Sequence, residues 1–191
     1  GVINVITKDP GDKPETIIRT RLRFYDKPAN PAADWDGRSS ALSYSFNASH
    51  SRRIAQVWDF TILADYIRNN SFRETEREKR MRFMTMNKFR FKKVSGLVLG
   101  LNAQWAVDST SENLFWNNYP NGALRPNPEF TTNLHNMRWS VDPSVSYVYK
   151  NMQFLYNSRI FSRSFLYKPD TLWKNEQRTK YNFFFNNKGT T

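Results

Sequence analysis

The sequence predicts an all-β chain, built as an antiparallel meander of about eight strands of the kind that crosses a membrane. Apolar residues recur with a period of two, the predicted strands are long, and long connections alternate with short ones along the 191 residues. The composition agrees with this fold class. The hydrophobic fraction, 39%, is low for a chain of this size, but the aromatic fraction, 16%, is high. Strict alternation can place many rings on one face with few apolar positions.

The first expected strand begins at Thr16 and separates two kinds of side chain. One face carries Ile18, Thr20, Leu22 and Phe24, and the other carries Arg19, Arg21 and Arg23. Three arginines opposite an apolar face need water on their own side and an apolar medium on the other. The sequence therefore favours a sheet that separates water from an apolar environment.

Seven further segments continue the alternation. They are residues 42–49, 58–66, 81–91, 97–107, 138–149, 152–162 and 181–186. The strands, roughly 9–13 residues each, match the length of a tilted transmembrane strand. In the fourth strand we place Phe83, Phe89 and Phe91 on the apolar face, and Met84 and Met86 on the polar face. In the seventh we place Phe154, Tyr156 and Ile160 outward, and Asn157 and Arg159 inward.

The expected connections alternate in length. The long ones are residues 26–39, 68–80, 108–136 and 163–177, and the short ones are residues 51–56, 92–96 and 150–151. Outer-membrane barrels have short periplasmic turns and long extracellular loops, whereas a soluble meander has no reason to alternate. The pattern favours part of a transmembrane antiparallel β-barrel.

The composition also limits the chemistry of the chain. It has no Cys, which excludes disulfides, thiolate metal sites and a Cys nucleophile, and no apolar run long enough for a transmembrane helix. The histidines, His50 and His135, form no metalloprotease motif, and no Gly-rich phosphate loop is present. Asp59 and Asp65 share a strand face but lie about 20 Å apart, too far for a pair of catalytic carboxylates. We expect no enzyme, no metal and no cofactor.

The opening GVINVITK resembles the end of the plug domain of Bacteroidetes-type TonB-dependent outer-membrane receptors. Its residues are Gly1, Val2, Ile3, Asn4, Val5, Ile6, Thr7 and Lys8. In that family a short linker and then the first barrel strand follow, and the polar residues 9–15 and the strand from Thr16 match this order. Residues 92–105 and 138–150 also resemble barrel hairpins of such receptors.

The resemblance implies a division of the chain into the C-terminal end of a plug domain (residues 1–8), a linker (residues 9–15) and the N-terminal part of an outer-membrane barrel (residues 16–191). The family's barrel has about 22 strands, so we expect an internal fragment of a longer protein.

The family's activity is import of a ligand, such as a siderophore, vitamin, oligosaccharide or peptide, into the periplasm of a Gram-negative cell. The resemblance implies an outer-membrane location and contact with lipid and lipopolysaccharide. Further implied partners are the chain's own plug domain, the TonB complex, reached through an upstream segment, and a surface lipoprotein. No nucleic acid is expected.

Charged residues that point into the barrel are the candidate functional residues. They are Arg19, Arg21, Arg23, Asp59, Asp65, Lys88, Arg90, Arg138 and Asp142, with Arg159 beside them. Two interpretations remain open: docking of a polar plug, or a positive lining that favours anionic ligands, given the net charge of +12. In the longest loop Phe115, Trp116 and Tyr119 either stack on a ligand or pack on the rim.

Two other functions compete with transport. A complete eight-stranded membrane barrel, acting as an adhesin or anchor, can close with its interior filled by side chains. A soluble nucleic-acid-binding protein would use basic and aromatic residues, but on a binding sheet these lie on the same face. Here the sequence places them on opposite faces.

Overall fold

The computed structural model describes the backbone of residues 9–27, 29–31, 42–71, 73, 76–113, 131–168 and 173–187. Side chains are described within these ranges up to residue 164, except those of residues 112, 113 and 131. The expected plug end, residues 1–8, therefore lies outside the described residues. So do the loop residues Phe115, Trp116 and Tyr119.

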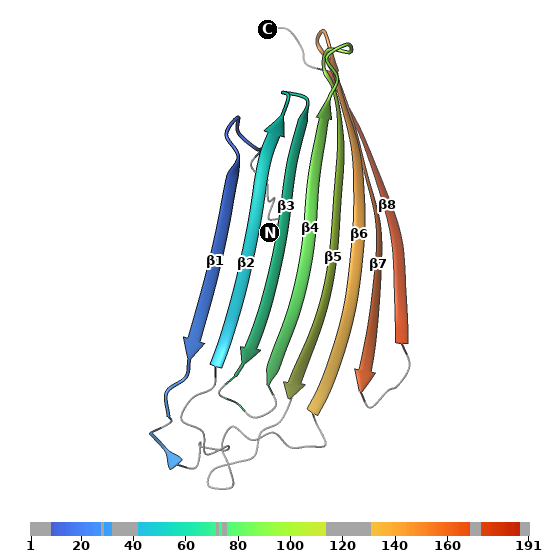
Figure 1. Ribbon diagram of the computed structural model, residues 1–191. Coiled ribbons are helices and arrows are strands. Elements are labelled where there is room, and N and C mark those ends of the chain that lie inside the picture. The colour runs from blue at the N-terminus through green and yellow to red at the C-terminus, as the bar shows by residue number, and fades with distance from the viewer. Residues whose placement is uncertain are drawn as a thin grey trace.

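Eight strands lie side by side in one sheet, in the order in which they occur along the chain (Figure 1). All neighbouring pairs are antiparallel, which confirms the predicted all-β meander. The strands are β1 (Glu15–Phe24), β2 (Leu42–Ile54), β3 (Trp58–Asn70), β4 (Arg77–Arg90), β5 (Leu97–Asn113), β6 (Thr131–Tyr149), β7 (Met152–Lys168) and β8 (Trp173–Asn187). β1 and β8 form the two edges, so the sheet is open rather than closed into a barrel.

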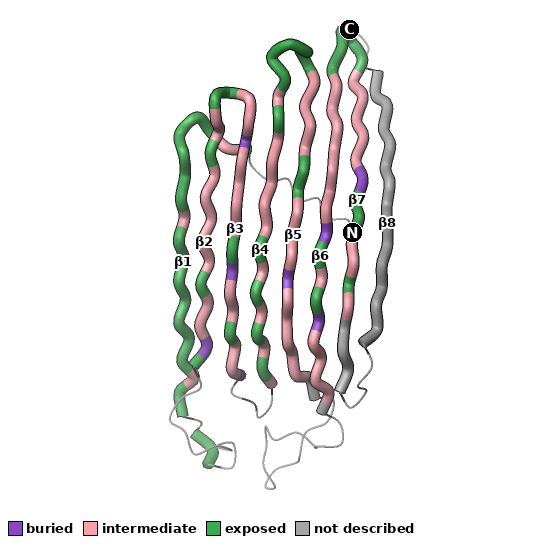
Figure 2. Tube along the Cα trace, turned by 45° about the vertical axis from the view of Figure 1, so that its right-hand side comes forward, coloured by how far each residue is buried: buried purple, intermediate pink, exposed green. Residues whose placement is uncertain are grey.

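The sheet is curved along the direction in which the strands follow each other (Figures 1 and 2). Residues 55–57, 91–96 and 150–151 connect strands at one end, which we call the turn end. Strands β1, β3, β5 and β7 end at the opposite end of the sheet, which we call the loop end.

The hairpins at the turn end require unusual backbone conformations. Ala55 and Gln56 have φ angles of 49° and 61°, and the N–H of Val57 donates to the carbonyl of Ile54 at 3.1 Å. Two successive positive φ angles are typical of a two-residue hairpin turn that follows the twist of the strands. Gly96 has a φ of 84°, and a Cβ there would lie 2.1 Å from the carbonyl oxygen of Val148. Only glycine fits at that position.

The strands extend further than the apolar alternation predicts, so four expected connections were too long. β3 and β4 together take up most of residues 68–80, β5 and β6 enter residues 108–136 from both sides, and β7 and β8 shorten residues 163–177. The physical reason is that a β-ladder is held by backbone hydrogen bonds, which polar residues make as well as apolar ones. For the same reason β2 takes up residues 51–54 of the expected short connection 51–56, and His50 lies within the strand.

The register confirms the expected phase of the strands, including the two least regular ones. In β4 Phe83 pairs with Ala64, whereas Met84 pairs with Leu63 on the other face. Pro143 pairs with Leu101 on β5, but the β6–β7 ladder is interrupted at Asp142 and Pro143. Proline has no N–H to donate, which accounts for the interruption.

Candidate functional site

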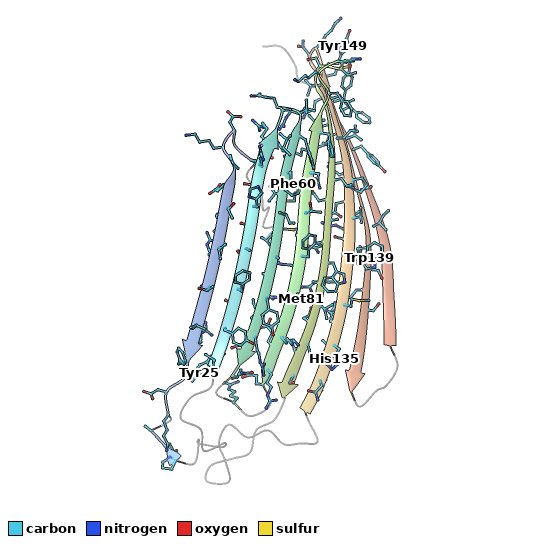
Figure 3. All side chains as sticks on the ribbon, in the orientation of Figure 1. Tyr25, Phe60, Met81, His135, Trp139 and Tyr149 are labelled. Atoms are coloured by element: carbon cyan, nitrogen blue, oxygen red, sulfur yellow. The ribbon has the colours of Figure 1, made fainter. Side chains whose placement is uncertain are left out.

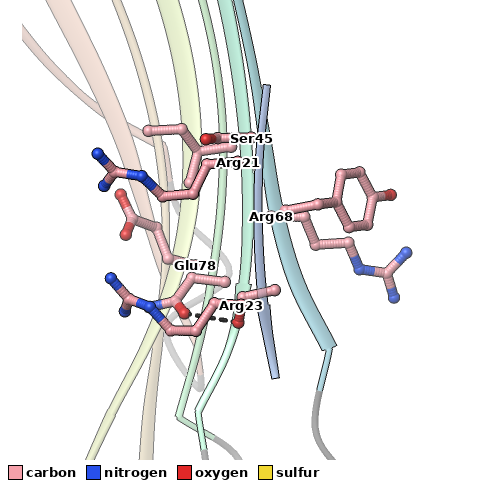
Figure 4. Close-up of a pocket in the computed structure, with 9 residues that line it drawn as sticks. Arg21, Arg23, Ser45, Arg68 and Glu78 are labelled. Atoms are coloured by element: carbon pink, nitrogen blue, oxygen red, sulfur yellow. Dashed lines mark hydrogen bonds between the residues drawn. The ribbon is translucent and has the colours of Figure 1, made fainter. Parts of the chain in front are cut away.

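The two faces of the sheet differ in the kind of side chain they carry. The polar face is the one that carries Arg19, Arg21 and Arg23 on β1, continued across the other strands by the register. Figure 4 looks along the sheet and shows Arg21, Arg23 and Glu78 on its concave side, whereas Arg68 points the other way. The polar face is therefore the concave face, and the apolar face is the convex one.

Exposure on the two faces is the reverse of that in a water-soluble protein. Among the described strand residues, every exposed large apolar side chain except Val148 lies on the apolar face, and Leu22 is 64% exposed. Figure 3 labels four residues of the apolar face: Phe60, Met81, Trp139 and Tyr149. Among the described strand residues, the buried ones are polar except Ala106, and all except Ser158 lie on the polar face. They include Ser43, Asp59, Asp65, Asn136 and Ser140.

The structure brings all nine predicted inward-facing residues onto the polar face. The β1 arginines lie opposite Asn47, Ser45 and Ser43 of β2. Asp59 and Asp65 lie opposite Lys88 and Arg82 of β4, and Asn102 of β5 lies opposite Asp142 of β6. Arg90 and Arg138 complete the set. They lie opposite Val98 and Ala106 of β5, which are on the other face of the sheet from Leu99 and Trp105.

Asp59 forms the centre of a charged cluster near the turn end. Its side chain is 2% exposed and accepts a hydrogen bond from the Nε of Arg53 at 2.7 Å. An Nη of Arg90 lies 2.6 Å from its second oxygen. Arg53 is a residue that the sequence reasoning missed. The signal was the turn at residues 55 and 56, which places Arg53 opposite Asp59 in an antiparallel pair.

The segment before β1 joins this cluster and lies over the polar face. Asp9 forms an ion pair with Lys88, and an Nη of Arg53 donates to Asp12 at 3.3 Å. Asp9 and Pro10 also share a small cavity with Asp59, Thr61 and Lys88. We call these two ion pairs the linker clasp, because Asp9 and Asp12 belong to the expected linker.

Three further polar contacts link neighbouring strands towards the loop end. The Nε of Arg82, also missed in the sequence, donates to Asp65 at 2.6 Å. Arg159 holds Asp142 with two hydrogen bonds, each 2.7 Å long. Asn136 donates to Asp108 at 3.0 Å. Two-point contacts between arginine and a carboxylate fix both partners in position.

The β1 arginines differ from these paired groups. Among the described residues Arg19 and Arg21 form no ion pair, and Arg23 contacts only the hydroxyl of Tyr25, at 3.4 Å. Arg21 and Arg23 line an open cavity of about 190 Å³ together with Ser45, Asn69 and Glu78 (Figure 4). Unpaired arginines on a water-facing wall are available to an acidic partner.

Aromatic rings gather towards both ends of the apolar face. Near the turn end Trp58 stacks on Phe89, with ring centroids 5.7 Å apart, and Tyr147 stacks on Tyr149. Near the loop end Tyr44 contacts Tyr66 at 5.9 Å. Rings concentrated at two levels are typical of the interfaces of a membrane barrel.

The described residues offer no metal site, and no described helix is long and apolar enough to span a membrane. The Oγ of Thr16 and the Nδ1 of His50 lie 2.8 Å apart, and the His50 ring also contacts Phe60. His135 pairs with Ser109 across the β5–β6 ladder. Among the described residues, no hydrogen bond or ion pair joins either histidine to a charged group.

Comparisons of the chain with family models, with curated proteins and with solved structures found no match. The candidate function therefore depends on the geometry of the sheet and on the resemblance of its opening residues.

Proposed function

We propose that the chain forms part of the wall of an outer-membrane β-barrel that imports a ligand, as TonB-dependent transporters do. One observation carries this proposal: nearly all of the exposed large apolar side chains of the described strands lie on the convex face, while the buried carboxylates Asp59 and Asp65 lie on the concave face. Outer-membrane barrels have this arrangement, with an apolar band outside and a polar interior. A soluble sheet would bury the apolar face instead.

The dimensions of the strands support a membrane span. The strands from β2 to β7 have 13, 13, 14, 17, 19 and 17 residues, well above the usual five or six of soluble strands. Trp58 and Tyr66 lie on one strand at about 26 Å from each other, given the usual rise per residue. With a tilt of about 40° this separation spans about 20 Å of membrane, close to the height of the apolar band.

The open edges define what else the wall requires. β1 and β8 each leave one row of backbone groups without a strand partner among the described residues. In lipid such groups must be paired, so the proposed barrel contains further strands beyond these two edges.

The linker clasp supports the plug-docking role of the polar face. It connects residues 9–12 to the β2–β4 region at the turn end, which is the periplasmic end in this proposal. A plug that precedes β1 would thus enter the barrel from the periplasm. The unpaired Arg19 and Arg21 are then available to carboxylates of the plug or of an anionic ligand.

A pair of adjacent residues in the middle of β4 provides the test. The chain has no natural Cys, so Phe83→Cys and Met84→Cys each create a single labelling site, on the apolar and the polar face respectively. In lipid vesicles we expect a water-soluble maleimide to label the Cys at position 84 and to leave that at position 83 largely unreacted. Urea should remove the difference.

Equal labelling of the two variants in vesicles would overturn the membrane assignment. A chain that stays in buffer and binds DNA with a steep salt dependence would instead support the soluble nucleic-acid-binding alternative. Both substitutions shorten the side chain, but β4 has hydrogen-bonded neighbours on both sides that hold its backbone. Folding of each variant is checked by its circular dichroism spectrum.

A further inference from the structure

A second cavity lies on the polar face, about halfway along β6 and between β5 and β7. Its volume is about 220 Å³, and its lining includes Gln104, Ser140, Phe161 and the arginines Arg138, Arg159 and Arg163. The register explains the grouping, because Gln104, Ser140 and Phe161 lie opposite each other on three successive strands. No described carboxylate belongs to the lining, although Asp108 and Asp142 lie beside it as ion-pair partners of Arg138 and Arg159.

Arg138 provides the cation that is available for a ligand. The carboxylate oxygen of Asp108 lies 3.9 Å from its Nη1, too far for a hydrogen bond. Among the described residues no hydrogen bond of the Arg138 guanidinium is present, although it carries five N–H donors. Arg159 is 57% exposed, and its Nε and one Nη donate to Asp142. The other Nη of Arg159 is left for the cavity.

Ser140 gives an independent indication that a partner is missing. Its side chain is 5% exposed, and its Oγ has no hydrogen-bond partner among the described residues. Buried hydroxyls are nearly always paired, so an unpaired one that lines a cavity suggests a ligand. Ser140 also lies two residues from Arg138 on the same strand face, within reach of the same bound anion.

Phe161 adds an apolar wall to a face that is otherwise mainly polar. The cavity is smaller than the roughly 300–1,000 Å³ of sites for drug-sized molecules. We propose that Arg138, Ser140 and Phe161 form a binding site for a small organic acid, whose carboxylate is attached to an apolar group. The carboxylate contacts Arg138 and the Ser140 hydroxyl, and the apolar group packs on Phe161. This inference rests on the proposed function only in that the polar face meets water.

The probe for the test is para-fluorophenylacetate, observed by fluorine NMR with the full chain refolded in detergent. We expect it to bind, and we expect the neutral alcohol 2-(para-fluorophenyl)ethanol to bind at least about tenfold more weakly. Arg138→Gln should weaken binding of the acid by about tenfold, because a charged hydrogen bond is lost. Arg138→Lys keeps the positive charge but lacks the planar guanidinium, and it should weaken binding less than Arg138→Gln does. Ser140→Ala should weaken it by a smaller factor than Arg138→Gln.

Arg52→Gln on β2 is the matched control, because Arg52 is an exposed arginine of the apolar face that lines none of the three cavities described above, and it should leave binding of the acid unchanged. Equal binding of the acid and the alcohol, or unchanged binding in both Arg138 variants, would overturn the inference. Insertion into vesicles is measured on the same preparations. Loss of probe binding with insertion intact would refute this site alone, whereas failed insertion with retained binding would refute the membrane proposal alone.

Discussion

At the scale of single residues, Asp59 shows how the sheet tolerates charge. It is the most deeply buried charged side chain among the described residues, yet both of its oxygens are bound by arginine. A buried carboxylate without such partners would be strongly unfavourable. The position of Asp59 therefore depends on Arg53 from β2 and Arg90 from β4 together.

Replacing Asp59 should accordingly cost much more than replacing an acid of the same face whose ion pair is more exposed to solvent. Asp59→Asn leaves two arginines without their counter-charge, and we expect the free energy of unfolding to fall by about 3 kcal/mol. Asp142→Asn is the control, because its partner Arg159 is mostly exposed, and it should cost about 1 kcal/mol or less. Guanidinium titrations of both variants in detergent measure the difference. Equal costs would show that the Asp59 cluster adds nothing beyond a surface ion pair.

For the candidate residues, the sequence predicted the face of the sheet on which each one lies, but not the residue with which it pairs. Alternation alone placed Arg19, Asp59 and Arg138 on one face, because side chains of a strand point to opposite sides in turn. Which residues pair across strands could not be predicted in that way. Arg53 and Arg82 were missed because their partners depend on the register, which a single turn conformation fixes.

At the scale of elements, the β2–β3 hairpin turn is strained by its own sequence. Ala55 and Gln56 both have positive φ angles, which cost non-glycine residues roughly 1 kcal/mol each. The turn is retained because the strands on either side form a continuous ladder from Ile54 and Trp58 onward.

Gln56→Gly should therefore stabilise the folded chain by about 1 kcal/mol, because glycine adopts this conformation without strain. Gln153→Gly is the matched control, since that position lies inside β7, where glycine weakens a strand. The midpoints of guanidinium unfolding should shift in opposite directions. A lower midpoint for Gln56→Gly would show that the native turn lacks the positive φ angle at this position.

The linker clasp is the other element whose role can be tested directly. Lys88→Glu should break the pair with Asp9 and expose residues 9–14 to subtilisin, since two carboxylates would then repel each other. The double variant Asp9→Lys, Lys88→Glu restores the opposite charges and should restore protection. If the double variant is cleaved as fast as the single one, the ion pair does not hold the segment.

The ends of the strands are the feature of the elements that the sequence could not predict. Apolar alternation stops near Val107 on β5, yet the ladder continues to Asn113 through Asp108 and Ser111. Alternation reports only where one face meets an apolar medium, whereas hydrogen bonding decides where a strand ends. The extra residues of β5 and β6 are polar and fit a hairpin that projects beyond the membrane at the loop end.

At the scale of the whole molecule, the proposal depends on which face meets lipid. Phe83, Trp105 and Trp139 lie opposite each other on β4, β5 and β6, on the apolar face and between the levels of Trp58 and Tyr66. On the other face the neighbouring residue, Met84, lies between Leu63 and Gln104. The two adjacent positions thus sample the two environments at the same depth.

Phe83→Arg should strongly reduce insertion into vesicles, whereas Met84→Arg should have little effect. A charge on the lipid face costs up to about 2–4 kcal/mol depending on its depth, while the polar face already carries Arg82 next to position 84. Flotation of the two variants with lipid vesicles measures the inserted fraction, and a folded yield in detergent controls for general damage. Equal insertion of both would exclude the lipid-facing assignment of the apolar face. Loss of insertion for Met84→Arg alone would assign lipid to the concave face instead, and the arginines of β1 would then need a different explanation.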